Sequence, residues 1–249
     1  MWKIEMKRHV KAIIPRSVLQ LVQRYRLVRL QRGFDGLDPS QAFSKIYEER
    51  LWGRSIHSDH DYCSGSGSSN PEIVGPYVES IRAWLRHLPN SPSVGDLGCG
   101  DFSVGSQLTD LASTWTSYDC VPSLIASNRR KFVKLQVQFK ELDLCAEAPE
   151  PADVYFLRQV LQHLSNSQIQ QVLDRVVSQC RWLVLTEHLP TKPFTPNKDK
   201  PVGPDVRVLH RSGVDVTQPP FNCTPVERVV LCRVIVSDGE IVTEALRFK

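Results

Sequence analysis

Residues 91–105 read SPSVGDLGCGDFSVG, in which an apolar run extends to Asp96 and is followed by Gly98 and Gly100. A short apolar run that ends at closely spaced glycines predicts a buried strand followed by a tight turn. Glycine allows backbone conformations and close approaches that other residues do not. The turn is therefore the strongest candidate for a ligand-binding loop in this chain.

Two common glycine-rich phosphate cradles do not fit this turn. A loop of the type G-x-x-x-x-G-K-[ST] needs a lysine, and none follows Gly105. The dinucleotide fingerprint G-x-G-x-x-G needs a third glycine where Ser103 stands, and Phe102 occupies a position that is usually small. The glycines alone do not identify the ligand.

Strand-like and helix-like patterns alternate after residue 93. The runs SVGDL, WTSYD, VQFKELD, DVYFL and WLVLTEH predict strands, and SNSQIQQVLDRVVSQC predicts a helix with a capping box formed by Ser165 and Gln168. VERVVLCRVIV and EIVTEALRF, joined through SDGE, predict an antiparallel hairpin. We expect an α/β fold with a Rossmann-like, seven-stranded, mostly parallel sheet, a C-terminal antiparallel hairpin, helices on both faces and a helical N-terminal extension.

Acidic residues end the first three predicted strands. Asp96, Asp119 and Asp143 close SVGDL, WTSYD and VQFKELD, counting the residue at or next to each end. The carboxyl ends of parallel strands share one edge of an open sheet, where ligands bind. Three acids there could accept hydrogen bonds from an amine, a ribose diol and an adenine amine. These are the donors of S-adenosyl-L-methionine, a nucleoside without phosphate.

On these residues the sequence resembles the class I S-adenosylmethionine-dependent methyltransferases, over residues 93–187 and the terminal hairpin. The resemblance implies that the loop after the first strand holds the methionine part of the cofactor, that Asp119 binds the ribose and that Asp143 lies at the adenine. Asp101 either contacts the cofactor amine or caps the next helix. The expected cofactor-binding residues are Asp96, Gly98, Cys99, Gly100, Asp101, Asp119, Cys120, Asp143, Leu144, Arg158 and Gln159.

Methyl transfer to a hydroxyl needs a group that takes the proton, and histidine suits this role. His163 follows the fourth predicted strand, and Glu187 and His188 end the fifth, so all three are candidate catalytic residues. His163 is the first choice as general base and His188 the second. The alternatives are a structural role for His163 before the capped helix and a turn role for His188 before Pro190.

The acceptor is expected to be small and polar, most plausibly with a sugar or natural-product hydroxyl. FLRQ stands where base and glutamine methylases have [DN]-P-P-[YF], and the chain has no Pro-Cys pair. A weaker resemblance is to small bacterial methyltransferases of glycan or secondary-metabolite pathways. Residues 188–226 form a long Pro-rich segment, which is either an acceptor-site insertion or a surface excursion without ligand. Candidate substrate-binding residues are Trp52, Arg54, Asn197, Asp199, Arg207, His210 and Phe221. No metal site is predicted.

Composition and charge limit the other functions. The chain has 249 residues and seven scattered cysteines without a C-x-x-C pair, which predicts neither a disulfide framework nor a zinc site. No apolar run approaches the roughly 18 residues of a membrane span, so we expect a cytoplasmic protein, either free or peripheral to a membrane. Residues 1–32 hold nine Lys and Arg against Glu5 alone.

This basic segment predicts an amphipathic helix. It would dock on an anionic membrane or a partner, or pack on its own domain; nucleic acid is disfavoured because no aromatic residues are interleaved. We expect an extension over residues 1–70 and a methyltransferase domain over 71–249. The competing functions are a non-catalytic cofactor-binding scaffold and a nucleic-acid methyltransferase that uses the basic segment.

Overall fold

The computed structural model describes residues 31–54, 62–191 and 193–248. The chain divides into two units, residues 1–36 and 37–249. The predicted basic helix lies almost entirely outside the described residues, so its contact with a membrane or partner stays a prediction. Residues 37–70 belong to the same unit as the sheet, so this boundary does not coincide with the predicted one at residue 70.

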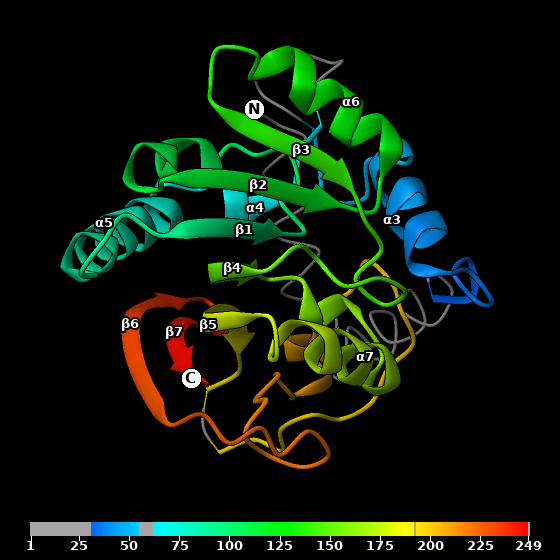
Figure 1. Ribbon diagram of the computed structural model, residues 1–249. Coiled ribbons are helices and arrows are strands. Elements are labelled where there is room, and N and C mark those ends of the chain that lie inside the picture. The colour runs from blue at the N-terminus through cyan, green and yellow to red at the C-terminus, as the bar shows by residue number, and fades with distance from the viewer. Residues whose placement is uncertain (1–30, 55–61, 192, 249) are drawn as a thin grey trace, which may run out of the picture. The chain divides into compact units, whose positions relative to one another are not determined.

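The second unit is built on a seven-stranded sheet with the strand order β3-β2-β1-β4-β5-β7-β6 (Figure 1). The five strands β1 to β5 run parallel, and β7 pairs antiparallel with both β5 and β6. The strands are β1 (Ser93–Leu97), β2 (Thr114–Asp119), β3 (Val137–Glu141), β4 (Ala152–Arg158), β5 (Cys180–Leu189), β6 (Glu227–Val236) and β7 (Gly239–Arg247). The predicted sheet and its C-terminal hairpin are confirmed.

Polar side chains cap the starts of α3 (Pro39–Glu48), α5 (Pro71–His87) and α7 (Asn166–Val176). Asp38 caps α3 in a capping box with Gln41, and Asn70 caps α5. The predicted box of Ser165 and Gln168 caps α7. The other helices are α4 (Ser66–Ser69) and α6 (Pro122–Lys131), with the short 3-10 turns η1 (Gly105–Gln107), η2 (Thr109–Leu111), η3 (Leu161–His163) and η4 (Arg207–His210).

The sheet has a buried layer on each face. On one face Tyr77 and Ile81 of α5 and Ile125 of α6 pack in a cluster with Trp115 and Phe156. Strand residues point alternately to opposite faces, and the residues that alternate with this cluster are also buried, among them Tyr155, Leu157, Leu183 and Leu185. The buried side of α7 (Ile169, Val172, Leu173 and Val176) lies outside the cluster and covers this second face.

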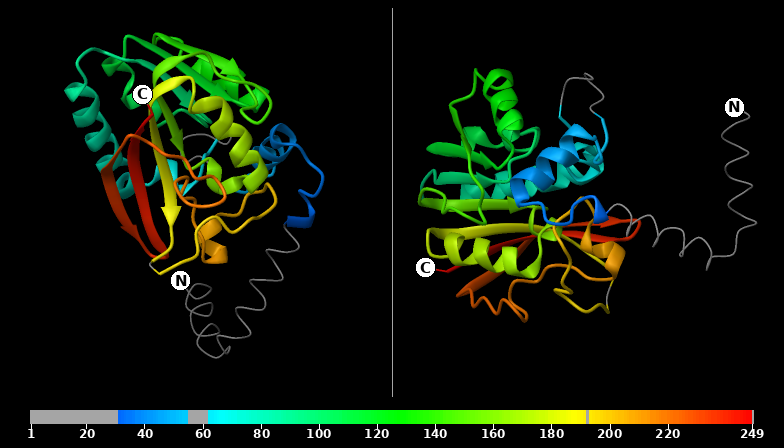
Figure 2. Two further views of the ribbon diagram at one scale, coloured as in Figure 1. Left: turned by 60° about the horizontal axis from the view of Figure 1, so that its bottom comes forward. Right: turned by 90° about the vertical axis from the view of Figure 1, so that its right-hand side faces the viewer.

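Among its described residues, the segment between β5 and β6 contains only η4 as regular structure, and it runs along α7 (orange in Figure 2). Asn166 at the start of α7 holds this segment, because its N–H donates to Asp199 Oδ1 at 2.7 Å and its Oδ1 accepts from Arg207 at 3.0 Å. The segment is therefore folded and attached to the start of α7.

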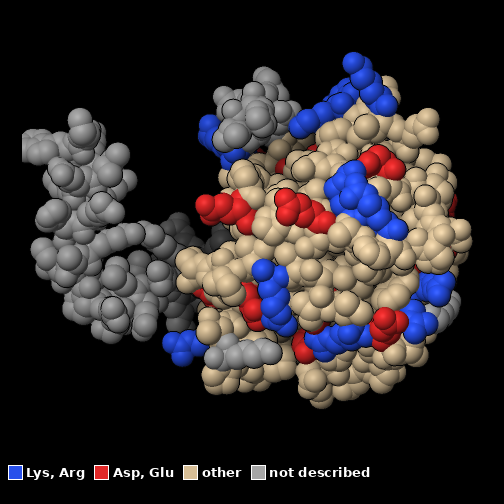
Figure 3. All heavy atoms as spheres, turned by 90° about the vertical axis from the view of Figure 1, so that its left-hand side faces the viewer, with Lys and Arg blue, Asp and Glu red and all other residues tan. Residues whose placement is uncertain are grey.

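The outer surface mixes charges of both signs. On the face shown in Figure 3, basic and acidic side chains alternate without forming a continuous basic stripe among the described residues. Among these same residues no helix is long and apolar enough to cross a bilayer.

Candidate functional site

The glycine turn, residues 98–102, follows β1 and packs closely against Val160 and Ser64. Gly98 and Gly100 have positive φ angles of 70° and 56°, which favour glycine. A side chain at Gly98 would collide with Val160, and one at Gly100 would collide with Ser64. The turn therefore needs glycine for both its conformation and its close packing.

Phe102 occupies a position of the turn that is usually small, and the structure accommodates its ring. It has a positive φ of 58°, and its fully buried ring packs edge-on against Phe132 and Phe139, with centroids 5.1 and 4.9 Å away. Gly105 provides the space, since a Cβ there would lie 2.6 Å from Asp96 Oδ2 and would collide with the Phe102 ring. The turn thus directs an aromatic side chain into the core.

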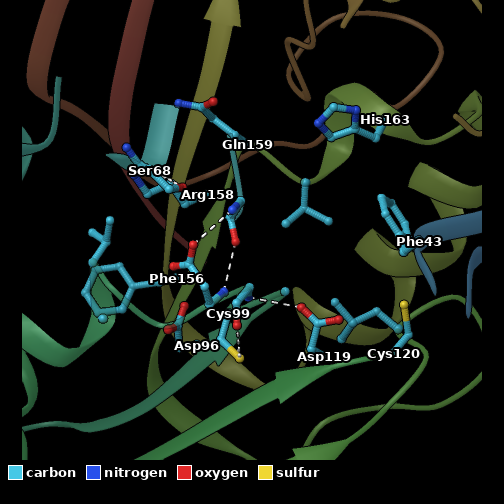
Figure 4. Close-up of a pocket in the computed structure, with 18 of the residues that line it drawn as sticks. Phe43, Ser68, Asp96, Cys99, Asp119, Cys120, Phe156, Arg158, Gln159 and His163 are labelled. Carbon is cyan, nitrogen blue, oxygen red and sulfur yellow. Dashed lines mark hydrogen bonds between the residues drawn. The ribbon is translucent and has the colours of Figure 1, made fainter. Parts of the chain in front are cut away.

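The three strand-end acids line one cleft with the glycine turn, as the sequence predicts. Figure 4 shows two of them, Asp96 and Asp119. Asp119 accepts hydrogen bonds from Gly100 N at 3.0 Å and Val121 N at 3.1 Å. Asp143 Oδ1 accepts from Cys145 N at 2.8 Å. The carboxylate of Asp96 accepts no hydrogen bond from any described residue, although the side chain is buried. Asp96 is therefore the acid with the most unmet capacity for a donor.

Burial raises the pKa of two of these carboxyl groups. It raises the pKa of Asp96 to about 7, against the opposing charge of Arg158, and raises that of Asp119 to about 6, against the backbone N–H groups of the turn. A cationic or hydrogen-bond-donating ligand would stabilise both carboxylates. Carboxyls with such shifted pKa values inside a cleft are typical of functional sites.

Asp101 fastens the Gly/Ser segment to the turn. Its Oδ2 accepts from Ser64 N at 2.9 Å, and its own N–H donates to Ser64 Oγ at 2.9 Å. Its Oδ1 accepts from Ser103 N at 3.0 Å. Tyr47 of α3 adds a hydrogen bond between its hydroxyl and Ser64 Oγ, at 3.1 Å. Asp101 thus links two segments over the cleft, and contact with a cofactor amine stays a prediction.

Arg158 and Gln159 extend the wall of the cleft from the end of β4. The Arg158 guanidinium lies 4.8 Å from the ring centroid of Tyr77 and donates to Gly67 O at 2.5 Å and to Ser68 Oγ at 3.1 Å. Gln159 has a positive φ of 56°, and its amide packs so close to Gly67 that a side chain there would collide with it. β4 therefore connects the cleft to the short helix α4.

Aromatic rings form the other end of the cleft, beside His163. The His163 ring lies edge-on to Phe43, with centroids 6.2 Å apart, and 4.8 Å from the ring of Trp52. Burial, together with the nearby charge of Lys200, lowers the pKa of His163 to about 4. His163 is therefore neutral near pH 7.

The other two catalytic candidates lie away from the cleft. His188 points toward the β6–β7 turn, where its Nε2 is 3.3 Å from Asp238 Oδ1. Glu187 is buried, and burial raises its pKa to about 8 against the opposing charge of Arg207. Neither residue lines the cleft, because β5 continues past the end of β4 and pairs there with β7.

The candidate acceptor residues of the long segment also do not reach the cleft. Asn197 bonds the segment to itself, since its amide donates to Asp215 O at 2.8 Å and Pro219 O at 2.9 Å. Arg207 is fully buried and donates to Leu164 O at 2.7 Å. The cleft is lined by Trp52 but not by Arg54, Asn197, Asp199, Arg207, His210 or Phe221. These six residues were expected at the acceptor site, and the structure does not place them at the cleft.

Sequence reasoning missed several residues of the cleft. Tyr47, Ser64, Ser68, Tyr77, Val160 and Gln162 all line it. Gln162 is 2% exposed and its Oε1 has no hydrogen-bond partner among the described residues. A tyrosine on the otherwise apolar faces of α3 and α5 was the available signal for Tyr47 and Tyr77. The described residues contain no group of three or more metal-binding side chains.

Comparisons with solved structures identify the architecture. No family model matches the sequence, and no curated protein matches it. The chain is similar to the N-methyltransferase NodS from Bradyrhizobium japonicum in complex with S-adenosylhomocysteine, with a TM-score of 0.58 and 16% identity over 83% of this chain and 98% of NodS. The chain has the fold of the class I S-adenosylmethionine-dependent methyltransferases.

Two further structures share this methyltransferase fold. The magnesium protoporphyrin IX methyltransferase from Synechocystis, solved with bound S-adenosylmethionine, has a TM-score of 0.56 and 17% identity, covering 86% of this chain and 99% of its own. A methyltransferase from Leishmania major has a TM-score of 0.59 and 12% identity, covering 88% and 89%. At these identities the likeness concerns the fold.

Proposed function

We propose that the chain is an S-adenosylmethionine-dependent methyltransferase that methylates a hydroxyl group of a small polar acceptor, with His163 as the general base. The observation that carries the proposal is the single cleft at the carboxyl edge of the sheet. It brings together the glycine turn, the acids that follow β1, β2 and β3, and a neutral histidine. This edge is the usual ligand site of open α/β sheets.

The residues of the cleft fit the cofactor. The buried Asp96 carboxylate lacks a hydrogen-bond donor among the described residues and is suited to the cofactor ammonium group. Each oxygen of Asp119 has a second lone pair for a ribose hydroxyl. The space between the walls of the cleft, counted with its open mouth, is about 1110 Å³.

Bound S-adenosylmethionine supplies a methyl carbon that its sulfonium already activates. The protein then has to align the acceptor oxygen and remove its proton. The carbonyl of Gly203 lies 3.2 Å from His163 Nδ1 and can only accept, so Nδ1 carries the proton. His163 Nε2 is then the basic nitrogen, and it accepts a hydrogen bond from the Gln162 amide nitrogen at 3.4 Å. With a pKa of about 4, it holds no proton of its own at pH 7.

The lining beside His163 favours an uncharged acceptor. Phe43, Trp52 and Val160 supply apolar surface, and Gln162 supplies an unpaired amide oxygen. The charged residues of the cleft are Asp96, Asp101, Asp119, Asp143 and Arg158, all at the strand ends or in the glycine turn. A ring with neighbouring hydroxyl groups, as in a sugar or a hydroxylated natural product, matches an aromatic wall with an amide beside it.

The test uses the purified full chain. Calorimetry with S-adenosylhomocysteine measures cofactor binding, and transfer of a labelled methyl group to a panel of sugars, phenols, amines and nucleic acids measures activity. Transfer to neutral hydroxyl compounds supports the proposal. Cofactor binding without transfer to any member of the panel would support a scaffold role. Transfer only to amines or nucleic acids would overturn the assignment to a hydroxyl.

A further inference from the structure

The long segment after β5 bonds two residues of the cleft through its backbone carbonyls. Gly203 and His163 bond reciprocally, because Gly203 N donates to His163 O at 3.1 Å and His163 Nδ1 donates to Gly203 O at 3.2 Å. The next residue, Pro204, accepts a hydrogen bond from Trp52 Nε1 at 3.2 Å. One dipeptide therefore holds both the histidine and the tryptophan of the aromatic end.

A buried ion pair brackets this dipeptide. Lys200 Nζ lies 3.2 Å from Asp205 Oδ1, and their side chains are only 4% and 8% exposed. Lys200 Nζ also donates to His163 O at 3.4 Å. Asp205 Oδ2 lies 2.6 Å from His210 Nε2 at the surface. The pair joins the two ends of the loop formed by residues 200–205, which contains Gly203 and Pro204.

A buried ion pair contributes little net stability, because both charges lose their hydration. Apolar side chains of similar size would close the same loop at least as well. A buried charged pair can instead specify a geometry, because each charge must face its partner. The Lys200–Asp205 pair is therefore better explained by orientation than by stability.

We infer that Lys200 and Asp205 are positioning residues, which hold the Gly203 and Pro204 carbonyls so that His163 keeps its proton on Nδ1 and Trp52 stays over the cleft. The inference deepens the proposed function, since it rests on His163 Nε2 as the base. It also gives the segment a role at the site, although its side chains do not line the cleft. The base is oriented by a carbonyl, as in other sites where the second ring nitrogen of a histidine sets its tautomer.

The test reads the His163 tautomer by nitrogen-15 NMR of the imidazole, with His163→Gln to assign the signals. In the unmodified chain we expect the Nδ1–H tautomer to dominate; a dominant Nε2–H tautomer would overturn the inference. The variant Lys200→Met with Asp205→Asn removes both charges and leaves neither buried alone. We expect it to show a mixture of tautomers, whereas a spectrum unchanged from that of the parent would overturn the inference.

Two controls keep the result interpretable. Arg233→Gln with Glu240→Gln removes an ion pair of the β6–β7 hairpin, 2.9 Å long, and should not change the His163 spectrum. If the double variant at Lys200 and Asp205 does not fold, Lys200→Gln with Asp205→Asn is the milder variant, because it keeps polar side chains and leaves no charge buried alone, and it should shift the tautomer in the same direction. An unchanged tautomer in this folded variant would then overturn the inference.

The activity measurement separates this inference from the proposed function. With a hydroxyl acceptor, we expect the double variant to lower kcat by about tenfold, less than the roughly hundredfold loss of a base, with S-adenosylhomocysteine affinity unchanged. A tautomer shift in a chain that methylates no acceptor would leave the positioning role intact and refute the proposed function. Methyl transfer with an unchanged kcat and tautomer would refute the positioning role alone.

Discussion

The N–H of Gly100 donates to Asp119 Oδ2 at 3.0 Å, so the turn after β1 is tied to the acid that ends β2. The bond joins the two sequence features that indicated a cofactor site. It also means that Asp119 has two tasks, because the carboxylate that faces the cleft also fixes the backbone of the glycine turn. Changes on either side of this bond should affect the same binding step.

Gly100→Ala should abolish S-adenosylhomocysteine binding. Alanine disfavours the φ of 56°, and its Cβ would collide with Ser64, so the turn must move. The matched control is Gly75→Ala on α5, where a Cβ meets nothing within 4 Å, and which should raise stability by about 0.5–1 kcal/mol. Calorimetry and thermal unfolding of the two variants check this. Cofactor affinity in Gly100→Ala equal to that of the parent would contradict it.

Asp119→Ala should weaken S-adenosylhomocysteine binding by about 10- to 150-fold, the equivalent of one lost charged hydrogen bond of about 1.5–3 kcal/mol. Asp153→Ala is the control, because Asp153 is an acid at the opposite edge of the sheet, where it accepts from Ser93 N at 2.8 Å. Its removal should lower stability and leave the dissociation constant unchanged. Equal losses of affinity in the two variants would show that Asp119 acts only through the fold.

The sheet and the acids were predictable because each depends on a local pattern. Alternating strand and helix periods give the parallel sheet, and strand-end residues of such a sheet meet at one edge. The cleft residues that come from distant parts of the chain could not be predicted. Ser64, for example, bonds to Asp101 across 37 residues, and no local pattern signals that contact. Asn197 was expected to bind the acceptor, but its amide bonds its own loop. In sequence, such an asparagine looks the same as one that binds a ligand.

Cofactor affinity should rise with pH between about 5 and 8. Burial raises the pKa of Asp96 to about 7 and that of Asp119 to about 6, so both carboxyls are largely protonated in the free protein at pH 5. The cofactor ammonium group favours the ionised carboxylates, and binding near pH 6.5 should therefore release protons. Calorimetry in buffers of different ionisation enthalpy measures this release. An affinity that does not change from pH 5 to 8 would be inconsistent with either carboxyl binding the ligand in its ionised form.

His163→Ala should lower kcat by about a hundredfold or more while S-adenosylhomocysteine affinity stays the same. His188→Ala is the matched control, because this histidine pairs with Asp238 away from the cleft and should leave kcat unchanged. Since the pKa of His163 is about 4, its Nε2 is free of protons above about pH 5, and protonation of this base should not reduce kcat between pH 5 and 8. A loss of kcat in His188→Ala alone would reverse the assignment.

Glu187→Gln should stabilise the cofactor-free protein near pH 8 and leave methyl transfer unchanged. Burial raises the pKa of this carboxyl to about 8, far above its value in the unfolded chain. The native state therefore binds a proton that the unfolded state releases, and stability falls as pH rises from about 4.5 toward 8. Glutamine keeps the shape and cannot ionise, so the gain at pH 8 should be about 1–3 kcal/mol, discounted for the nearby charge of Arg207. Urea unfolding at pH 5 and pH 8 measures the difference, and a variant less stable than the parent at both pH values would show that Glu187 is ionised and paired with Arg207 in the native state.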